Sequence, residues 1–329
     1  MNATLRVLSS ILTSVQDLGR PGWQRYGVPS AGAMDSFALE AGNRLVGNPP
    51  GAAALEITAG AAFEILEPAL LALTGASLGA LLDGLPLPAW TAVFARPGAQ
   101  LQLPGRGGAW GARAYLALAG GVAAPELLGS RSTYLPGGFG GLDGRALRPG
   151  DLVSVGAALQ DIGWPAGRRW PERARPPYRA QPELRLIRGP HADLFAADAL
   201  ELLLAQPFQI GRDSNRMGYR LEGARLPYAR PVSLPSLGVL PGVVQVPPDG
   251  APILLMADAQ TTGGYPIAGV VIGADLPLAA QLLPGDRLRF ALASIEEARD
   301  AWRRLRSWAA APIEEDEAAQ LVGWAGAVG

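Results

Sequence analysis

The chain has 329 residues, enough for one large domain or two of ordinary size, and 49% of them are hydrophobic. Its formal net charge is −1 and all 28 basic residues are Arg, so nucleic-acid binding as a main role has no electrostatic support. Because the sequence contains no Lys, no Cys and only one His, it excludes a Schiff-base lysine, a thiol nucleophile, a disulfide and a metal site built from several His or Cys ligands.

The N-terminal half begins with a strand pattern and continues into a helix pattern. Residues 3–10, ATLRVLSS, lack the positive region and long apolar stretch of a signal peptide. Residues 34–48 place Met34 and Leu45 along one helical face, and Gly47 can end the helix. Since no run approaches the roughly 18 apolar residues of a membrane span, we expect a cytoplasmic protein that does not enter a membrane.

Two Pro-Gly-Asp turns, one in each half of the chain, lead into alternating strand patterns. The segments are LRPGDLVSV at 147–155 and LLPGDRLRF at 282–290. Pro suits the first central position of a tight turn, and Gly tolerates the positive φ of the second. The repeat predicts two similar halves, although Pro-Gly turns are common in this chain and RPGAQLQL at 96–103 is another.

A Pro- and Arg-rich segment at 161–182 has no clear period and is interpreted as a linker. The second half then opens with the strand pattern ELRLIRGP and the helix pattern DLFAADALELLLAQ. Near the C-terminus, Ser294 and Glu297 have the spacing of a capping box ahead of an amphipathic helix.

These patterns predict a mainly β protein with a few helices. The 43 Gly and 30 Pro residues favour short strands joined by many tight turns. The predicted division is an N-terminal β domain at 1–160, the linker at 161–182, a C-terminal β domain at 183–293, and a helix with a tail at 294–329.

Four stretches concentrate Arg, Asp, amide and hydroxyl side chains beyond what turns require. They lie at 13–39, 128–141, 211–223 and 243–266. Arg forks bind carboxylate or phosphate bidentately, and Asp and amide groups position substrates or relay protons. The alternative is that Asp17, Asp213 and Asp258 cap turns and that the arginines form structural ion pairs. The fourth stretch most favours a site, because its polar groups directly follow a buried strand and each needs a partner.

Two further features predict no chemistry. The single His191 lies just before a helix pattern, where a cap or a satisfied surface group is favoured over catalysis. The glycines of GGFGGLDG form no dinucleotide fingerprint, since no G-x-G-x-x-G joins a strand to a helix there. No metal site is predicted.

The polar stretches also carry motifs of a known family, in order from about Ser14 to about Phe290. These include QDLGRPG, GVPSAGAMD, NRLVGNP, LE at 55–56, YLALAGG, LGSRST, GGFGG, DSNRMGYRLEG, VVQVPPDGAPILLMADAQTTGGYP and LAAQLLPGD. With them the chain resembles the family of KipA, the C subunit of bacterial 5-oxoprolinase (PxpC). That family also contains the biotin-dependent carboxyltransferase domain of urea carboxylase, often labelled allophanate hydrolase subunit 2. The resemblance implies two tandem cyclophilin-like β-barrel domains.

For function, the resemblance implies three alternatives. The leading one is the C subunit of an ATP-dependent 5-oxoprolinase, which opens 5-oxoproline to L-glutamate together with a KipI-like B subunit, and with a LamB/YcsF-like protein as the A subunit. The second is carboxyl transfer from carboxybiotin to urea or a related amide. The third is a regulatory protein that binds a KipI-like partner without turnover. Since the sequence holds no biotin-carrier segment and no ATP-grasp region, we expect a stand-alone subunit that acts on a small lactam or urea-like molecule.

The motif match places candidate site residues in all four polar stretches. The catalytic candidates are Asp17, Asp258 and Arg216. The substrate-binding candidates are Arg20, Met34, Asp35, Arg131, Thr133, Asp213, Tyr219, Arg220, Gln245, Gln260, Thr261, Thr262 and Tyr265.

The expected roles follow from side-chain chemistry. Arg216 or Arg220 would hold the substrate carboxylate, and Asp258 or Asp17 would orient water or accept a proton. The polar side chains at 260–265 would contact the lactam.

The expected cofactor of the leading alternative is ATP, and that of the second is carboxybiotin. In a chain without Lys, the phosphates of ATP must be held by Arg, by backbone N–H groups or by a partner subunit. Arg20 and Arg131 would hold the phosphate or another anion. The sequence departs from the common family pattern where PSLGVLPG lacks an acidic residue before GV and where Ser214 and Asn215 precede Arg-Met-Gly, so substrate contacts at these positions stay open.

Overall fold

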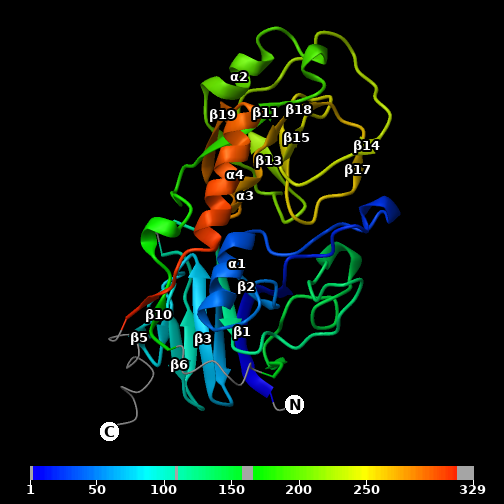
Figure 1. Ribbon diagram of the computed structural model, residues 1–329. Coiled ribbons are helices and arrows are strands. Elements are labelled where there is room, and N and C mark those ends of the chain that lie inside the picture. Colours follow the sequence, from blue (N-terminus) through cyan, green and yellow to red (C-terminus); the bar gives the residue numbers. More distant parts are fainter. Residues whose placement is uncertain (1–2, 108–109, 158–165, 317–329) are drawn as a thin grey trace. The chain divides into compact units, whose positions relative to one another are not determined.

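The computed structural model describes residues 3–107, 110–157 and 166–316 (Figure 1). The chain forms two compact units. Unit 1 comprises residues 1–20, 35–175 and 308–329, and unit 2 comprises residues 21–34 and 176–307. Residues 21–34 therefore belong to unit 2 although residues of unit 1 flank them in the sequence. The first part of the predicted linker, up to residue 165, and the tail from 317 lie outside the described residues.

Unit 1 is built on a nine-stranded sheet in which each pair of neighbouring strands is antiparallel. Its strand order is β5-β4-β7-β2-β8-β3-β6, and β1 pairs with β2 and with β9. The strands of this sheet are β1 Ala3–Gln16, β2 Ala54–Ile65, β3 Ala69–Gly75, β4 Leu81–Leu82, β5 Leu85–Pro86, β6 Ala92–Ala95, β7 Gln100–Leu103, β8 Arg113–Leu118 and β9 Leu152–Ser154. The remaining elements are α1 Ser36–Leu45, the short 3-10 helices η2 Leu135–Gly137 and η3 Glu172–Ala174, and the two-stranded pair β10 Arg168–Arg169 and β20 Glu314–Glu315.

The sheet of unit 1 has an apolar core on one face and helix α1 on the other. In β7, QLQL, the two Leu side chains are buried and the two Gln side chains are exposed, as a period of two predicts for a half-buried strand. Strand β8 is buried along its whole length because α1 packs against β3 and β8 (Figure 1). The carboxylate of Asp35 caps this helix by accepting a hydrogen bond from the Ala38 N–H at 3.0 Å.

Unit 2 is a closed barrel with the strand order β11-β18-β15-β16-β13-β12-β19, and it closes where β19 pairs in parallel with β11. The barrel strands are β11 Glu183–Arg188, β12 Phe208–Ile210, β13 Gly218–Glu222, β15 Val243–Gln245, β16 Ile253–Leu255, β18 Ile267–Val271 and β19 Arg287–Leu292. A separate pair joins β14 Leu237–Gly238 to β17 Thr262–Gly263. The helices are η1 Gln24–Tyr26, η4 Ala192–Leu194, α2 Ala199–Ala205, η5 Gly273–Asp275, α3 Leu276–Ala279 and α4 Ile295–Ala309, of which the last two residues are assigned to unit 1.

The predicted fold class is confirmed. The chain is mainly β, with a half-barrel in unit 1 and a closed barrel in unit 2. The barrel is filled by side chains such as Phe208, Phe290 and Leu254, and Met34 packs into the same core. Segment 21–34 is thus anchored in unit 2 by an apolar side chain, which a sequence pattern within one half cannot indicate.

The two Pro-Gly-Asp turns have matching geometry. Gly150 and Gly285 have φ angles of 92° and 93°, the left-handed region that favours glycine. In each turn the Asp carboxylate accepts a hydrogen bond from the N–H three residues earlier, at 2.8 Å in both. The strands that follow differ, however, because β9 pairs antiparallel with β1 whereas β19 pairs in parallel with β11.

The helix patterns are confirmed with one interruption. The predicted capping box is present, since Ser294 N–H donates to the Glu297 carboxylate at 2.8 Å and Glu297 N–H donates to the Ser294 hydroxyl at 3.1 Å. The pattern at 193–206 instead divides into η4 and α2. Between them the Ala196 N–H bonds to the Pro227 carbonyl, beside the bridge from Phe195 to Tyr228, and this pairing replaces helical hydrogen bonds.

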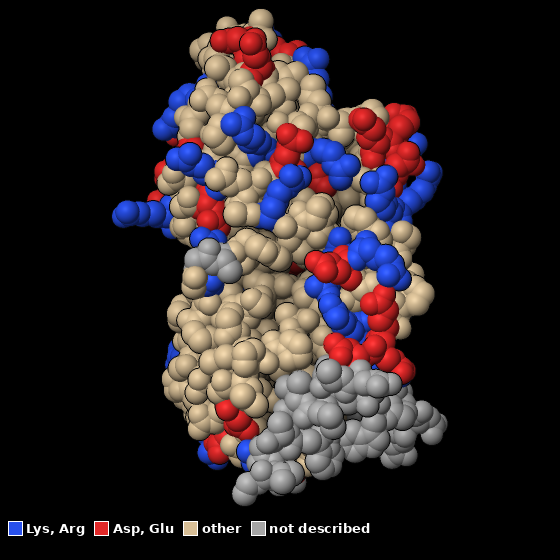
Figure 2. Space-filling model, turned by 90° about the vertical axis from the view of Figure 1, so that its left-hand side faces the viewer, with Lys and Arg blue, Asp and Glu red and all other residues tan. Residues whose placement is uncertain are grey.

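The surface carries charges of both signs. On the face shown in Figure 2, basic and acidic side chains lie interspersed, as the nearly balanced net charge leads one to expect. Among the residues described, no helix combines the length and the apolar character needed to cross a membrane.

The turn at Asp151 makes a pH-dependent contribution to stability. Arg145 donates to both carboxylate oxygens, at 2.6 and 3.0 Å, and this hydrogen bonding is the main cause that holds the pKa of Asp151 below its usual 3.8. A lowered folded-state pKa stabilises the fold above the unfolded pKa, and that stabilisation is lost as the pH falls through the folded pKa.

We expect Asp151→Asn to lower the free energy of unfolding at neutral pH by about 1 kcal/mol. The difference from the parent should shrink below about pH 4, as urea denaturation at several pH values can measure. Asp143→Asn is the control, because this carboxylate contacts the same Arg at 3.3 Å but is 79% exposed and should change stability little. A constant difference across the acid range would contradict the assignment.

Candidate functional site

In unit 2, a buried ion pair joins the third and fourth polar stretches. Nε and Nη2 of Arg216 donate to the two carboxylate oxygens of Asp258, at 2.9 and 3.0 Å. The side chain of Arg216 is 6% exposed and that of Asp258 is fully buried. The backbones are joined as well, since the Asp258 N–H donates to the Arg216 carbonyl at 2.9 Å. This bidentate arrangement fixes the position of both side chains.

The ion pair also holds a segment from the first polar stretch. Nη2 of Arg216 donates to the carbonyl of Gly32 at 2.5 Å. The loop GVPSAGAM, which enters unit 2 from far earlier in the chain, is therefore bonded to Arg216 and anchored nearby by Met34 in the core. Three of the four polar stretches thus meet at one buried guanidinium.

The loop 258–266 is fastened to the barrel through Gln245. The Gln260 amide donates to the Gln245 side-chain oxygen at 3.2 Å, and the Gln245 amide donates to the Tyr265 carbonyl at 3.4 Å. A Cβ at Gly263 would lie 2.6 Å from Nε2 of Gln245, so a larger residue at this position would displace the Gln245 amide. Gln245 is 2% exposed, and it therefore positions the loop.

The other polar residues of this loop lie nearer the surface. The Thr261 carbonyl accepts a hydrogen bond from the Val239 N–H at 3.0 Å, and Thr262 is exposed in the short strand β17. These contacts join the loop to the segment that contains β14. Thr261 is half-buried and Thr262 is exposed.

A cavity of about 370 Å³ in unit 2 contains two of the predicted substrate-binding residues, Arg220 and Tyr265. Glu222 also lines it, as do Arg225 and Asp249, which form an ion pair at 2.8 Å. Among the described residues, neither the guanidinium of Arg220 nor the hydroxyl of Tyr265 makes a hydrogen bond or ion pair within the chain. Both groups are therefore available to a ligand in this cavity.

The remaining candidates of unit 2 have other positions. Tyr219 points into the barrel core, where its hydroxyl donates to the Leu282 carbonyl at 3.3 Å. Asp213 is exposed on the loop between β12 and β13. His191 accepts a hydrogen bond on Nδ1 from the Ile267 N–H at 3.1 Å, in agreement with the predicted role of a satisfied group. Among the described residues, no three acidic or His side chains gather to hold a metal ion.

In unit 1, Asp17 is the centre of a buried hydrogen-bond cluster. Its Oδ1 accepts from the hydroxyls of Ser130 and Ser132 at 2.7 and 2.5 Å and from the Gly19 N–H at 2.7 Å. Its Oδ2 accepts from the Arg131 N–H at 2.6 Å. The carboxylate thus ties the end of β1 to the loop LGSRST, which joins the first two polar stretches.

The predicted anion-binding arginines of unit 1 extend this cluster. Arg20 is fully buried. Its Nη2 donates to the Ser132 carbonyl, and its guanidinium lies 5.1 Å from the centre of the Phe139 ring. Arg131 donates to the Ala124 carbonyl and lies 3.8 Å from the Glu126 carboxylate.

Thr133 and Asp35, the last two candidates of unit 1, also make internal hydrogen bonds. The Thr133 hydroxyl donates to the Val15 carbonyl at 3.1 Å. The Asp35 side chain caps α1, while its N–H donates to the Tyr115 hydroxyl at 2.8 Å. Both residues thus help to fix loops around the sheet.

Sequence reasoning did not select the Tyr115 and Glu56 side chains, which form a second buried polar group in unit 1. The Tyr115 hydroxyl donates to the Glu56 carboxylate at 2.8 Å, and Arg113 lies 3.7 Å from Glu56. Burial, followed by the charges of Glu56 and Asp35, raises the pKa of Tyr115 well above its usual value, so the phenol remains a donor. A Glu inside the apolar run of β2 is the signal that could have found it.

A double-mutant cycle can test the coupling between Arg216 and Asp258. Replacing either residue by Ala leaves a buried charge without its main partner, so each single change should cost about 3–5 kcal/mol of unfolding free energy. The double variant should cost less than the sum of the two, by more than about 0.5 kcal/mol. Urea denaturation measures all four stabilities, and additive costs would contradict a coupled pair.

Comparison with known proteins agrees with the motifs and the fold. The model of the family described as carboxyltransferase domain, subdomain A and B, matches residues 26–292. The C subunit of Escherichia coli 5-oxoprolinase is 40% identical over 90% of this chain and 93% of its own length. The Haemophilus influenzae protein of the same name is 34% identical over 88% and 91%.

Among solved structures, the K. lactis urea amidolyase is similar with a TM-score of 0.85 and 29% identity over 93% of this chain. The chain spans only 20% of that much longer protein. The family match covers most of the chain, and the two bacterial relatives are similar over nearly their whole length. The chain belongs to the carboxyltransferase domain family, subdomains A and B, that includes the C subunits of 5-oxoprolinase.

Proposed function

We propose that this chain is the C subunit of an ATP-dependent 5-oxoprolinase, a complex that opens 5-oxoproline to L-glutamate. The observation that carries the proposal is the 40% identity to the E. coli relative of that name, which extends over nearly the full length of both chains. Similarity over whole chains supports a shared role in a complex better than similarity to one domain of a longer enzyme does.

A protein of this kind acts with partners. We propose a KipI-like protein and a LamB/YcsF-like protein, in the roles of the B and A subunits, as the partners of this chain. The reaction adds water across the lactam C–N bond, with the oxygen going to the carbonyl carbon and a proton to the nitrogen. Because an amide resists attack by water, coupling to ATP hydrolysis is chemically reasonable.

The predicted anion-binding arginines of this chain fit ATP poorly. Arg20 donates to the Ser132 carbonyl and packs on Phe139, and Arg131 is bonded to the Ala124 carbonyl. Side chains with these internal contacts would have to rearrange to hold a polyphosphate. We therefore propose that a partner protein holds ATP, and we assign no step to ATP within this chain.

For the substrate, we propose the cavity of Arg220 and Tyr265. Arg220 can hold the carboxylate of 5-oxoproline, and the Tyr265 hydroxyl can bond to the lactam amide. Arg216 is the less suitable candidate, because its guanidinium is already bonded to Asp258 and Gly32. The ion pair instead positions the loop that presents Tyr265.

The second candidate function is carboxyl transfer from carboxybiotin to urea or a related amide. It is favoured by the similarity to the K. lactis urea amidolyase, with a TM-score of 0.85. In this alternative Arg220 would bind the carboxylate of carboxybiotin. The lower identity, 29% against 40% for the E. coli relative, makes it the second choice. A regulatory role in binding a KipI-like protein requires no turnover and remains the third.

Reconstitution separates these functions. We expect the chain, purified together with its two partner proteins, to form L-glutamate from 5-oxoproline only when ATP is present. A coupled glutamate assay measures this, and omission of the chain is the control. Glutamate formation that is unaffected by omitting the chain would refute the proposal. Carboxylation of urea by the chain with a carboxylated biotin carrier would favour the second function.

The cavity assignment predicts a specific kinetic effect. Arg220→Gln should raise the KM for 5-oxoproline about tenfold, because a charge-assisted contact to the carboxylate is lost, while kcat changes less. Tyr265→Phe should raise KM by a smaller factor. Arg287→Gln, at an exposed position on β19, is the matched control. An unchanged KM in Arg220→Gln would remove the cavity from the mechanism and leave the proposed role in the complex intact.

A further inference from the structure

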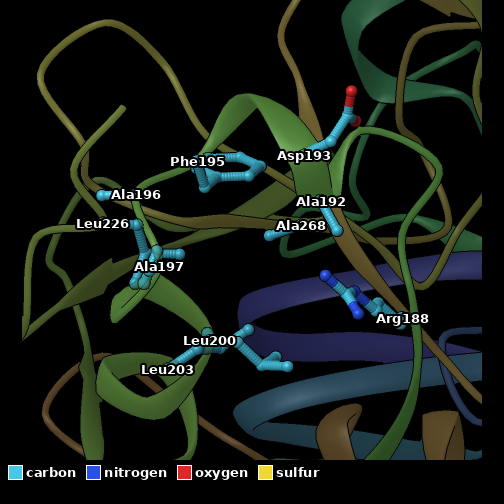
Figure 3. A pocket seen from close by; sticks show the side chains of 11 residues that line it. Arg188, Ala192, Asp193, Phe195, Ala196, Ala197, Leu200, Leu203, Leu226 and Ala268 are labelled. Carbon is cyan, nitrogen blue, oxygen red and sulfur yellow. The ribbon is translucent and has the colours of Figure 1, made fainter. Parts of the chain in front are cut away.

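A second cavity of about 270 Å³ lies in unit 2, at the end of β11 and between η4, α2 and β18 (Figure 3). None of the residues that line it is a candidate of the site described above. Its volume lies just below the range of about 300–1,000 Å³ that is typical of drug-sized ligand sites, so it suits a smaller molecule.

One side of this cavity is apolar and held in place. Phe195, Leu200, Leu203 and Leu226 line it. The Phe195 ring stacks on Tyr228 with ring centres 5.0 Å apart and an angle of 19° between the planes. The Leu203 side chain is 1% exposed and belongs to the barrel core. An apolar group of a ligand would therefore meet a preformed surface of aromatic and branched side chains.

Another wall of the cavity includes Arg188, Ala192 and Ala268, and the chain between β11 and η4, which joins the first two, follows β18 closely. The Gly189 N–H donates to the Ala268 carbonyl at 2.9 Å, and the Ile267 N–H donates to Nδ1 of His191 at 3.1 Å. A Cβ at Gly189 would lie only 2.2 Å from the Ile267 carbonyl oxygen. This close backbone approach fixes the wall and gives His191 a structural role.

Among the described lining residues, Arg188 is the one cation, and it reaches into the cavity from this wall. Figure 3 shows its guanidinium beside Ala192 and Ala268, while the carboxylate of Asp193 points away from it. Within the described residues the guanidinium of Arg188 makes no hydrogen bond or ion pair. A cation that borders a preformed apolar surface is complementary to an anion that carries an apolar group.

We propose that this cavity is a binding site for a small monocarboxylate with a branched aliphatic or aromatic group. Its carboxylate would accept hydrogen bonds from Arg188, and its apolar group would lie against Phe195 and Leu200. A carboxylate matches the one planar fork that Arg188 offers. A phosphate ester would find too few donors, since Arg188 is the one basic side chain among the described residues that line the cavity. This site is separate from the proposed 5-oxoproline cavity and does not depend on that assignment.

The test uses 4-methylpentanoate as the probe and isothermal titration calorimetry of the purified chain. We expect saturable binding of the carboxylate, and binding of the matched neutral amide, 4-methylpentanamide, that is weaker by about tenfold or more. Acetate has the same charge without the apolar group and should bind much more weakly than 4-methylpentanoate.

Variants locate the site. Arg188→Gln, at an exposed position where folding should be unaffected, should weaken binding of 4-methylpentanoate about tenfold. Ala192→Leu should abolish binding by filling the cavity, and circular dichroism can verify that this variant is folded. Arg287→Gln, exposed on β19 and absent from the lining of both cavities, is the matched control and should bind like the parent. The proposal is overturned if the carboxylate shows no saturable binding, if Arg188→Gln binds as tightly as the parent, or if binding is lost in Arg220→Gln instead of Arg188→Gln.

Discussion

The bidentate bond between Arg216 and Asp258 is the interaction on which the organisation of unit 2 depends. Two charges this deeply buried require each other, since either one alone would be left in an apolar surrounding without its main counter-charge. The same guanidinium holds the Gly32 carbonyl, so the pair fastens the loop after β16, the loop before β13 and the segment 21–34. The polar loop 258–266, anchored at its first residue, can then present Tyr265 at a defined place.

Unit 1 also contains a buried carboxylate that joins loops, but hydroxyl and backbone N–H groups hold it in place of an Arg. The carboxylate of Asp17 is surrounded by two Ser hydroxyls and two backbone N–H groups, which all donate to it. Several hydrogen bonds to one carboxylate satisfy a buried charge much as one bidentate Arg does. In both units a family motif therefore contains a carboxylate that joins distant loops. Residues of these motifs stabilise the fold as well as lying near a proposed ligand site.

In this Lys-free chain, the buried and the exposed arginines discussed above have different roles. Arg20 and Arg216 are buried and bonded to neighbouring protein groups. Arg220 and Arg188 are exposed at the ends or outer faces of barrel strands, and each borders a cavity. Since an Arg carries its charge at all physiological pH values, its surroundings rather than its protonation decide whether it serves the fold or a ligand.

Local patterns in the sequence were sufficient to predict the mainly β class, the Pro-Gly-Asp turns, a helix within 34–48 and the capping box at Ser294. These features depend on periodicity and on contacts between near neighbours. The motifs also identified the polar stretches. Three outcomes became visible in the folded chain alone: residues 21–34 belong to unit 2, Tyr219 lies in the core, and Glu56 pairs with Tyr115. Such outcomes depend on contacts between residues far apart in the chain, and no local pattern encodes which distant group a buried polar side chain will meet.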